Sequence, residues 1–301
     1  MKKIGSAMAV RWITFAKSFS ILALAGIAFA QSANLDQVQK LYDRTQYDSA
    51  LKLLLPDSAD TAQHGVVQFW IGKNYFMKGE FRKSADFFQK AIDLESEKSE
   101  YFHWLGKAYG RLAETSNMFA APGYATKARQ NFEKAVLLDQ KNLEAINDLF
   151  EYYLDAPGFL GGGLDKAAKL ANMIGAVDPV EHHWALATIA ERKKQFDTAE
   201  EHFRRAMEMA PKQMGRAIDL ARFLSKQGKV QESDAVFALA EKINPNDPRY
   251  LWERANSYIR AKRNLDQAKL LLEKYMKAPL GPEDHRPEEA RKLLKLASSG
   301  A

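Results

Sequence analysis

The stretches that decide the fold are AEEHFRRAMEMAP at residues 199–211 and SDAVFALAEKINP at residues 233–245. Both contain a small residue, a phenylalanine four positions later, an alanine three positions after that, and a final proline. Apolar residues three and four apart lie on one face of an α-helix, and proline cannot continue a helix. Each stretch therefore predicts a helix that packs through one face and ends before its proline.

This layout recurs along the chain with a period of 34 residues. Prolines, tryptophans, glycines and tyrosines share the interval: Pro211, Pro245 and Pro279; Trp70 and Trp104; Gly72 and Gly106; Tyr75 and Tyr109. Such a period is typical of solenoids built from stacked helix–turn–helix units, because one helix pair alone cannot bury its apolar face.

On these residues the chain resembles the tetratricopeptide repeat family, whose 34-residue units carry small and aromatic residues at fixed places. Five units show the pattern: Gly72, Tyr75, Ser84 and Phe88; Gly106, Tyr109, Ala128 and Phe132; Ala187, Ala199 and Phe203; Ala221, Ser233 and Phe237; Ala255, Tyr258, Ala268 and Leu272. Two weaker units contain Leu41, Ala50 and Leu54, and Leu149, Tyr153, Ala167 and Ala171. The small residues are expected to let two helices approach, and the aromatic residues to fill the space between pairs.

The resemblance implies an all-α, right-handed superhelical solenoid of about seven such units over residues 31–281. Residues 282–301 are expected to form a C-terminal capping helix and tail, because Pro287 followed by two acidic residues is a good helix start. Its apolar residues should cover the open end of the stack: Ala290, Leu293, Leu294 and Leu296.

Residues 1–30 have the layout of a secretory signal peptide. They contain four basic and no acidic residues, then a short apolar run, and end in Ala28-Phe29-Ala30. Cleavage is expected after Ala30, and either Met1 or Met8 can be the start. The apolar run is shorter than the roughly 20 residues that span a bilayer. We therefore expect a periplasmic or secreted protein with no transmembrane segment in the mature chain.

Charge and cysteine content exclude several classes of site. The net charge of +6 falls to +6 − 4 = +2 without residues 1–30, so nucleic acid is not an expected partner. The chain has no cysteine, which excludes disulfides, thiolate metal sites and thiol nucleophiles. His182 and His183 are adjacent and point about 100° apart on a helix, so they are not expected to share a metal ion. We predict no catalytic residues, no metal and no cofactor.

The first helices of each unit are expected to line a concave groove where basic and aromatic residues alternate. Such a groove suits a protein or peptide segment with acidic and apolar side chains. The alternative is that the basic residues are ordinarily solvated and the tryptophans fill the stack. The candidate groove residues are Phe69, Lys73, Phe76, His103, Lys107, Arg111, Trp184, Arg192, Arg222, Lys226, Trp252, Asn256 and Arg260.

Two consecutive units carry insertions between their paired helices, at residues 114–123 and 155–163. Such loops line up on one edge of a solenoid, so Met118, Phe119, Phe159 and Leu160 are candidates for a second contact surface. Alternatively, these side chains fold back onto the ends of their own helices. Gly158 and Gly163 have phosphate-loop spacing, but leucine follows where lysine is required, so a nucleotide site is not expected.

These features favour an exported scaffold or adaptor that binds another protein through its groove and a loop edge, in cell-envelope assembly or organisation. An accessory subunit or a helical-repeat enzyme acting on envelope polymers is the second hypothesis. A structural spacer without a groove ligand is the third.

Overall fold

The computed structural model describes residues 35–55 and 64–299, so the predicted signal peptide lies outside the described residues. The chain divides into two compact units, Met1–Ser96 and Glu97–Ala301. Every regular element in the described residues is helical, which confirms the predicted all-α class. No helix in the described segments is long and apolar enough to span a bilayer.

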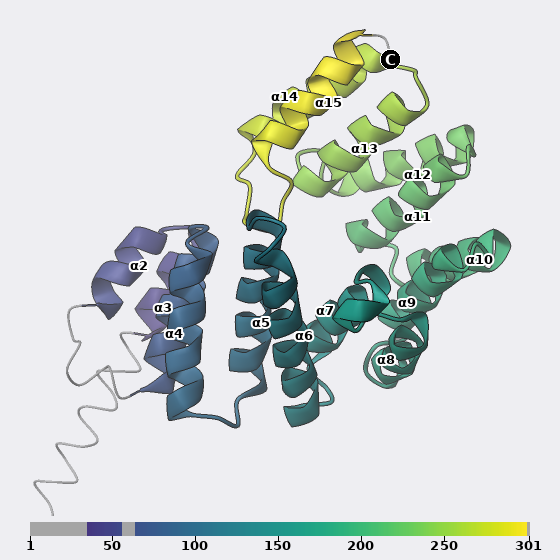
Figure 1. The fold of residues 1–301 in the computed structure, drawn as a ribbon. Coiled ribbons are helices and arrows are strands. Elements are labelled where there is room, and N and C mark those ends of the chain that lie inside the picture. The colour runs from purple at the N-terminus through teal and green to yellow at the C-terminus, as the bar shows by residue number, and fades with distance from the viewer. Residues whose placement is uncertain (1–34, 56–63, 300–301) are drawn as a thin grey trace, which may run out of the picture. The chain divides into compact units, whose positions relative to one another are not determined.

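The first unit contains two helix pairs (Figure 1). A helix over residues 35–43 pairs with α2 (Tyr47–Leu54), and α3 (Gly65–Met77) pairs with α4 (Phe81–Leu94). Val38, Ala50, Leu51 and Leu54 form a buried cluster with Val67 and Ile71 of α3. The weak N-terminal repeat is therefore a packed helix pair.

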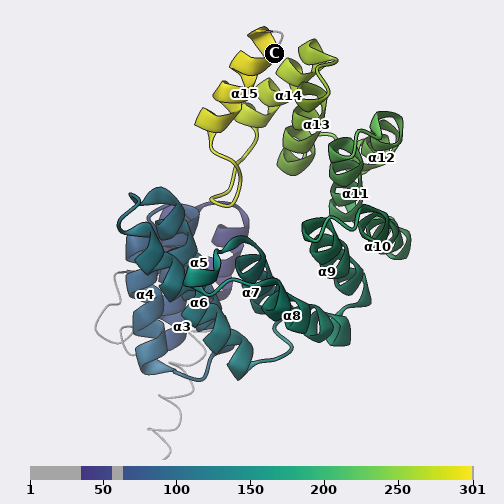
Figure 2. The same ribbon diagram turned by 45° about the vertical axis from the view of Figure 1, so that its right-hand side comes forward.

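The second unit contains five further pairs and a final helix (Figures 1 and 2). The pairs are α5 (Ser99–Thr115) and α6 (Ala121–Leu138); α7 (Leu143–Asp155) and α8 (Leu164–Val177), with the short helix η2 (Gly158–Leu160) between them; α9 (Pro179–Arg192) and α10 (Phe196–Met209); α11 (Met214–Lys226) and α12 (Val230–Ile243); α13 (Pro248–Arg260) and α14 (Leu265–Lys277). The final helix is α15 (Pro287–Ser299). Helices α10, α12 and α14 each end two residues before a proline of the 34-residue series.

Close approach between paired helices explains the small residues of the repeat. A Cβ atom at Gly106 would lie 2.6 Å from ring atoms of Phe132, and one at Gly72 would lie 2.6 Å from Phe88. The serines at the small position of second helices donate hydrogen bonds to first-helix carbonyls: Ser84 Oγ to Gly72 O at 2.9 Å and Ser233 Oγ to Ala221 O at 2.8 Å. Small size and hydrogen bonding thus join the two helices of each pair.

Helix α15 covers the end of the stack. Ala290 is buried, and Leu293 and Leu294 pack against the apolar core shared by the last units. The prediction for Leu296 is wrong, because that side chain is 47% exposed. A helix of this length buries one face only, and Leu296 lies away from it.

Candidate functional site

The first helices of successive pairs form the inner layer of the second unit. Helices α9, α11 and α13 follow its inner side, while α10 and α12 lie outside (Figure 2). Contacts between α5 and α7 and between α11 and α13 link first helix to first helix. We call the surface formed by α5, α7, α9, α11 and α13 the inner face.

A polar network crosses the middle of the inner face. Asn147 Nδ2 donates to Glu181 Oε1 at 3.1 Å, and Glu181 Oε2 lies 3.3 Å from Arg216 Nη1. The guanidinium of Arg216 lies over the ring of Trp184, 5.5 Å from its centroid. Asp219 is fully buried and is paired with Arg249. The network therefore joins α7, α9, α11 and α13.

The repeat period places these residues. Asn147, Glu181, Gly215 and Arg249 are separated by 34 residues each. A Cβ atom at Gly215 would lie 3.1 Å from Arg249 Nη1, so the glycine leaves room for that guanidinium. The sequence prediction missed Glu181, Arg216, Asp219 and Arg249, although this equal spacing of polar positions is a signal that could have found them.

The network is incompletely hydrogen-bonded. Within the described part of the chain, four of its buried atoms have no hydrogen-bond partner: Asn147 Oδ1, Arg216 Nε, Asp219 Oδ2 and Arg222 Nε. A buried polar atom left unpaired costs about 1–3 kcal/mol. Two of the four are acceptors and two are donors. Asn147, Arg216 and Arg222 are only partly buried, so small side-chain rotations can turn them toward a bound segment.

Carboxylates of α7 make part of the inner face acidic. Burial by the surrounding protein, together with the nearby charges of Asp148 and Asp155, raises the pKa of Glu151 to about 7. Its side chain nevertheless retains access to solvent. Burial also raises the pKa of Glu181, although Arg216 opposes this effect. The inner face is thus not the mainly basic surface that the sequence suggested.

Replacing Glu151 by glutamine should weaken the dependence of stability on pH. The folded-state pKa lies above the ordinary value of 4.5, so the folded chain binds this proton more tightly than the unfolded chain. The resulting stabilisation is complete below about pH 4.5 and is lost as the pH rises through about 7. Thermal midpoints should therefore fall less between about pH 5 and pH 8 for Glu151→Gln than for the wild type.

Glu144 lies on the same helix with an exposed side chain and supplies the control for that measurement. A Glu144→Gln variant should keep the wild-type change in midpoint. Equal changes in the wild type and Glu151→Gln would show that Glu151 does not titrate differently in the folded state.

The predicted groove cations are paired with carboxylates. Lys107 pairs with Glu283, Arg111 with Glu114, Arg192 with Asp155, and Lys226 with Glu191. Burial lowers the pKa of Lys107, but Glu283, Asp148 and Glu144 outweigh it and raise the pKa overall. Lys107 is therefore a charged, ion-paired group.

Several other predicted groove residues are buried or covered. Phe69 and Phe76 are interior, with ring centroids 5.6 Å from Phe88 and 5.3 Å from Phe81, respectively, so their assignment to a groove surface is wrong. Their helix places both on its packed side. Lys73, in the same unit, lies over the ring of Trp70, 4.6 Å from its centroid.

Within the second unit, His103 is buried and its Nε2 lies 2.7 Å from Asp148 Oδ2, so it links α5 to α7 and is not a groove surface residue. Trp252 is buried beneath His285. Trp184, Arg222 and Asn256 are half-buried, and Arg260 is exposed.

The two insertions differ in their burial. Met118, Phe119 and Phe159 are 79%, 88% and 83% exposed, so these side chains do not fold back onto their helices. Leu160 is half-buried, and its carbonyl accepts a hydrogen bond from Tyr152 Oη at 2.9 Å. The three exposed side chains remain candidates for a contact surface.

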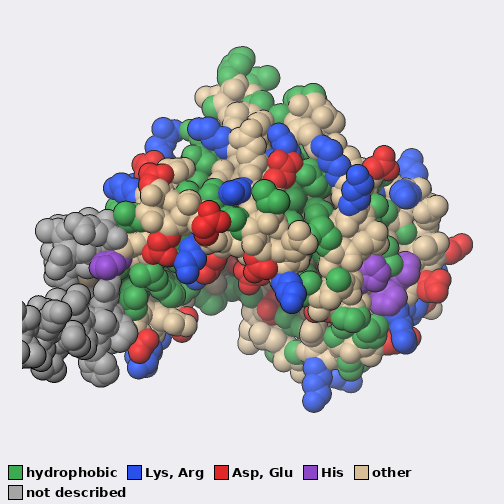
Figure 3. All heavy atoms as spheres, turned by 90° about the horizontal axis from the view of Figure 1, so that it is seen from below, with side chains coloured by type: hydrophobic (Ala, Val, Ile, Leu, Met, Phe, Trp, Pro, Cys, Tyr) green, Lys and Arg blue, Asp and Glu red, His purple; other side chains and the backbone are tan. Residues whose placement is uncertain are grey.

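A group of histidines lies at the surface (Figure 3), where the rings of His182, His183 and His202 approach one another. His183 Nδ1 lies 3.0 Å from His202 Nδ1, whereas His182 Nδ1 donates to Ala171 O at 2.8 Å. Burial and the two neighbouring imidazoles lower the pKa of His183. In residues 35–55 and 64–299, no group of three or more side chains is arranged to hold a metal ion.

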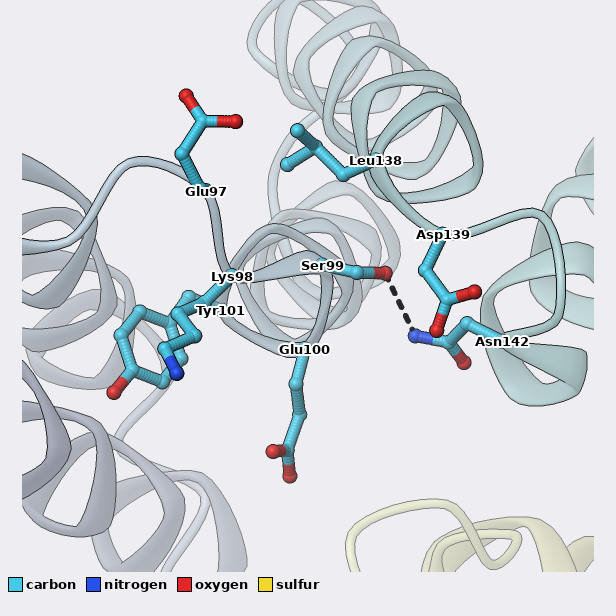
Figure 4. Close-up of a pocket in the computed structure, with 8 residues that line it drawn as sticks. All are labelled: Glu97, Lys98, Ser99, Glu100, Tyr101, Leu138, Asp139 and Asn142. Carbon is cyan, nitrogen blue, oxygen red and sulfur yellow. Dashed lines mark hydrogen bonds between the residues drawn. The ribbon is translucent and has the colours of Figure 1, made fainter.

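A cavity of about 410 Å³ lies between the start of α5 and the turn from α6 to α7 (Figure 4). Ser99 Oγ donates to Ala135 O at 2.8 Å and accepts from Asn142 Nδ2 at 2.9 Å. Asn142 Oδ1 also accepts from Ala145 N at the start of α7. These polar groups hold neighbouring units together and are not free for a ligand.

Comparison with known proteins supports the repeat assignment. Residues 191–251 match the model of the tetratricopeptide repeat family, and a search of curated protein sequences finds no match. A tetratricopeptide repeat protein from Parabacteroides merdae shares 14% identity and a TM-score of 0.66, over 89% of this chain and 98% of its own. A thermophilic TPR protein from Thermus thermophilus shares 20% identity and a TM-score of 0.52, over 64% of this chain and 98% of its own.

The structure of the APC/C hetero-tetramer Cut9–Hcn1 is also similar, with 17% identity and a TM-score of 0.56 over 86% of this chain and 48% of the other. At these identities the likeness concerns the fold. Together with the matched segment, which runs from the end of α9 to the start of α13, this fold identifies the chain as a tetratricopeptide-repeat protein.

Proposed function

We propose that this chain is an exported adaptor without catalytic activity, which holds a segment of another protein against the inner face of its second unit. Its fold is one that suggests a protein–protein interaction scaffold. Its place of action is the cell envelope, where it takes part in assembly or organisation.

The incompletely bonded network at the middle of the inner face carries this proposal. The backbone of an extended segment offers N–H donors and C=O acceptors in alternation. The unpaired atoms of Asn147 and Asp219 are acceptors, and those of Arg216 and Arg222 are donors. A bound segment can therefore supply both kinds of missing partner and remove a cost that the free protein bears.

An aromatic anchor lies beside these groups. Trp184 is half-buried between Phe150, 5.5 Å away, and the guanidinium of Arg216. Tryptophan and arginine are the residue types that contribute most to binding energy at protein interfaces. An apolar side chain of the bound segment is expected to contact Trp184 while the segment's backbone meets the polar network.

Export is proposed from the sequence. Residues 1–30 combine four positive charges, a short apolar run and the ending Ala28-Phe29-Ala30. The exported chain should begin at Gln31, which N-terminal sequencing of protein purified from the source organism's envelope fraction would establish.

Capture from envelope extract tests the inner face. The bait is the chain from Gln31, as wild type and as Asn147→Ala/Arg222→Ala. The variant removes one acceptor and one donor from the network, so we expect it to retain at least about tenfold less of a specifically bound protein. Quantitative mass spectrometry of the eluted proteins supplies the measurement.

A matched control removes the same residue types from second helices. Asn131 on α6 and Arg205 on α10 lie outside the inner layer, so Asn131→Ala/Arg205→Ala should capture the partner as the wild type does. Equal capture by all three baits would contradict binding at the inner face. In that case, baits changed at Met118, Phe119 and Phe159 would test the loop edge.

A further inference from the structure

The connection between α14 and α15 reaches back to α5 within the second unit. Figures 1 and 2 both show it at the end of α5 where that helix joins α6. Its sequence at residues 280–287 is Leu-Gly-Pro-Glu-Asp-His-Arg-Pro. We call these eight residues the acidic loop.

On α5 the acidic loop meets basic residues. Glu283 forms an ion pair with Lys107, although 176 residues separate them along the chain (283 − 107). Beside this pair lies a cavity of about 460 Å³, whose walls are Arg111, Glu114 and Thr115 on one side and residues 283–286 and 289 on the other. The loop therefore leaves unfilled space next to its ion pair.

On α13 and α14 the acidic loop meets aromatic residues. The imidazole of His285 stacks on Trp252, with ring centroids 4.0 Å apart and planes inclined by 15°. Tyr275 Oη donates to His285 O at 2.7 Å. The loop also braces itself, because Gly281 N donates to Asp284 Oδ2 at 2.7 Å.

These contacts are the ones expected of a bound peptide. The sequence pattern marks Lys107, Arg111 and Trp252 as anchors for a ligand with acidic and apolar side chains. An acidic, proline-bounded segment of this same chain lies against all three. The charge complementarity of the surface is thus demonstrated by its present occupant.

We propose that this surface binds an acidic peptide segment of a partner protein, and that the acidic loop is a built-in competitor which the segment displaces. The inference rests on the proposed adaptor function and names the chemistry of one end of its ligand. The partner segment supplies a carboxylate for Lys107 and a planar side chain for Trp252. The loop prevents weaker acidic peptides from occupying the site.

The effect of such a competitor follows from its occupancy. If the loop closes the site for about nine-tenths of the time, the apparent affinity for a peptide falls by about tenfold, because only the open fraction binds. Glu283→Gln/His285→Ala removes both side-chain anchors of the loop and should restore that factor. These side chains are exposed on a connection, so the fold should be preserved.

The test uses a fluorescein-labelled peptide with the sequence of residues 280–287, titrated into the full chain and followed by fluorescence anisotropy. We expect the dissociation constant for Glu283→Gln/His285→Ala to be at least about tenfold lower than for the wild type. Adding Lys107→Glu to that variant should abolish binding. A peptide carrying glutamine in place of its glutamate should bind the opened variant more weakly.

The matched control is Glu288→Gln/His64→Ala, which changes the same residue types at exposed positions away from the loop contacts. It should bind the peptide as the wild type does. Equal affinity in the wild type and the opened variant, or no binding to the opened variant, would overturn the proposal. If a partner is still captured through Asn147 and Arg222, only the loop inference fails; if loop-dependent peptide binding holds without that capture, only the central adaptor site fails.

Discussion

Replacing Gly106 by alanine is expected to lower the free energy of unfolding by about 1–3 kcal/mol, as overpacking of a filled core does. The added Cβ atom would lie 2.6 Å from two ring atoms of Phe132, well inside van der Waals contact. Phe132 is itself buried between α5 and α6, so its ring has little room to move. The variant should unfold at lower urea concentration, as followed by the helical signal in circular dichroism.

Gly110 provides the control one turn further along α5. A Cβ atom there would have no neighbour within 4 Å, and alanine favours helix over glycine by about 0.5–1 kcal/mol. Gly110→Ala should therefore be neutral or stabilising. If Gly106→Ala were as stable as Gly110→Ala, the account of the repeat as close helix approach would be wrong.

Replacing Gly162 by alanine should cost about 3 kcal/mol, at the upper end of the range for local backbone strain. The added Cβ atom would lie 1.7 Å from the carbonyl oxygen of Ala156, which belongs to the backbone and cannot rotate away. The turn must therefore open. We expect a lower thermal midpoint and faster hydrogen exchange at the amide of Gly163, which donates to Tyr153 O at 2.8 Å.

Gly158 opens the same connection and has space around it, since a Cβ atom there would meet nothing within 4 Å. Gly158→Ala should change stability by no more than about 0.5 kcal/mol. A midpoint for Gly162→Ala within error of the Gly158→Ala value would contradict the close backbone approach in the turn between α7 and α8.

The repeat architecture could be predicted from the sequence because the packing that creates it is periodic. The small residue of each first helix and the aromatic of each second helix touch, as Gly106 and Phe132 do, so the contact leaves a regular mark. Even the weak unit around Leu149 and Ala167 is a helix pair, α7 and α8. The C-terminal cap was predicted from its proline and acidic start, with only Leu296 misplaced.

The candidate site was less predictable. Helical periodicity indicates which way a side chain points, but not which charge lies opposite it. Lys226 and Glu191 pair across neighbouring units, and Lys107 pairs with Glu283 from the far end of the second unit. Such pairs leave no periodic pattern, so the sequence alone presents the basic residues of the inner face as unpaired.

Direct contact with the partner tests the central claim best. Thr188 on α9 faces the inner layer one turn from Trp184, and Leu239 on the outer helix α12 is exposed. A photo-crosslinking residue, p-benzoylphenylalanine, can replace either one before illumination in envelope extract. We expect the captured partner to crosslink from position 188 and not from position 239; crosslinking from position 239 alone would contradict binding at the inner face.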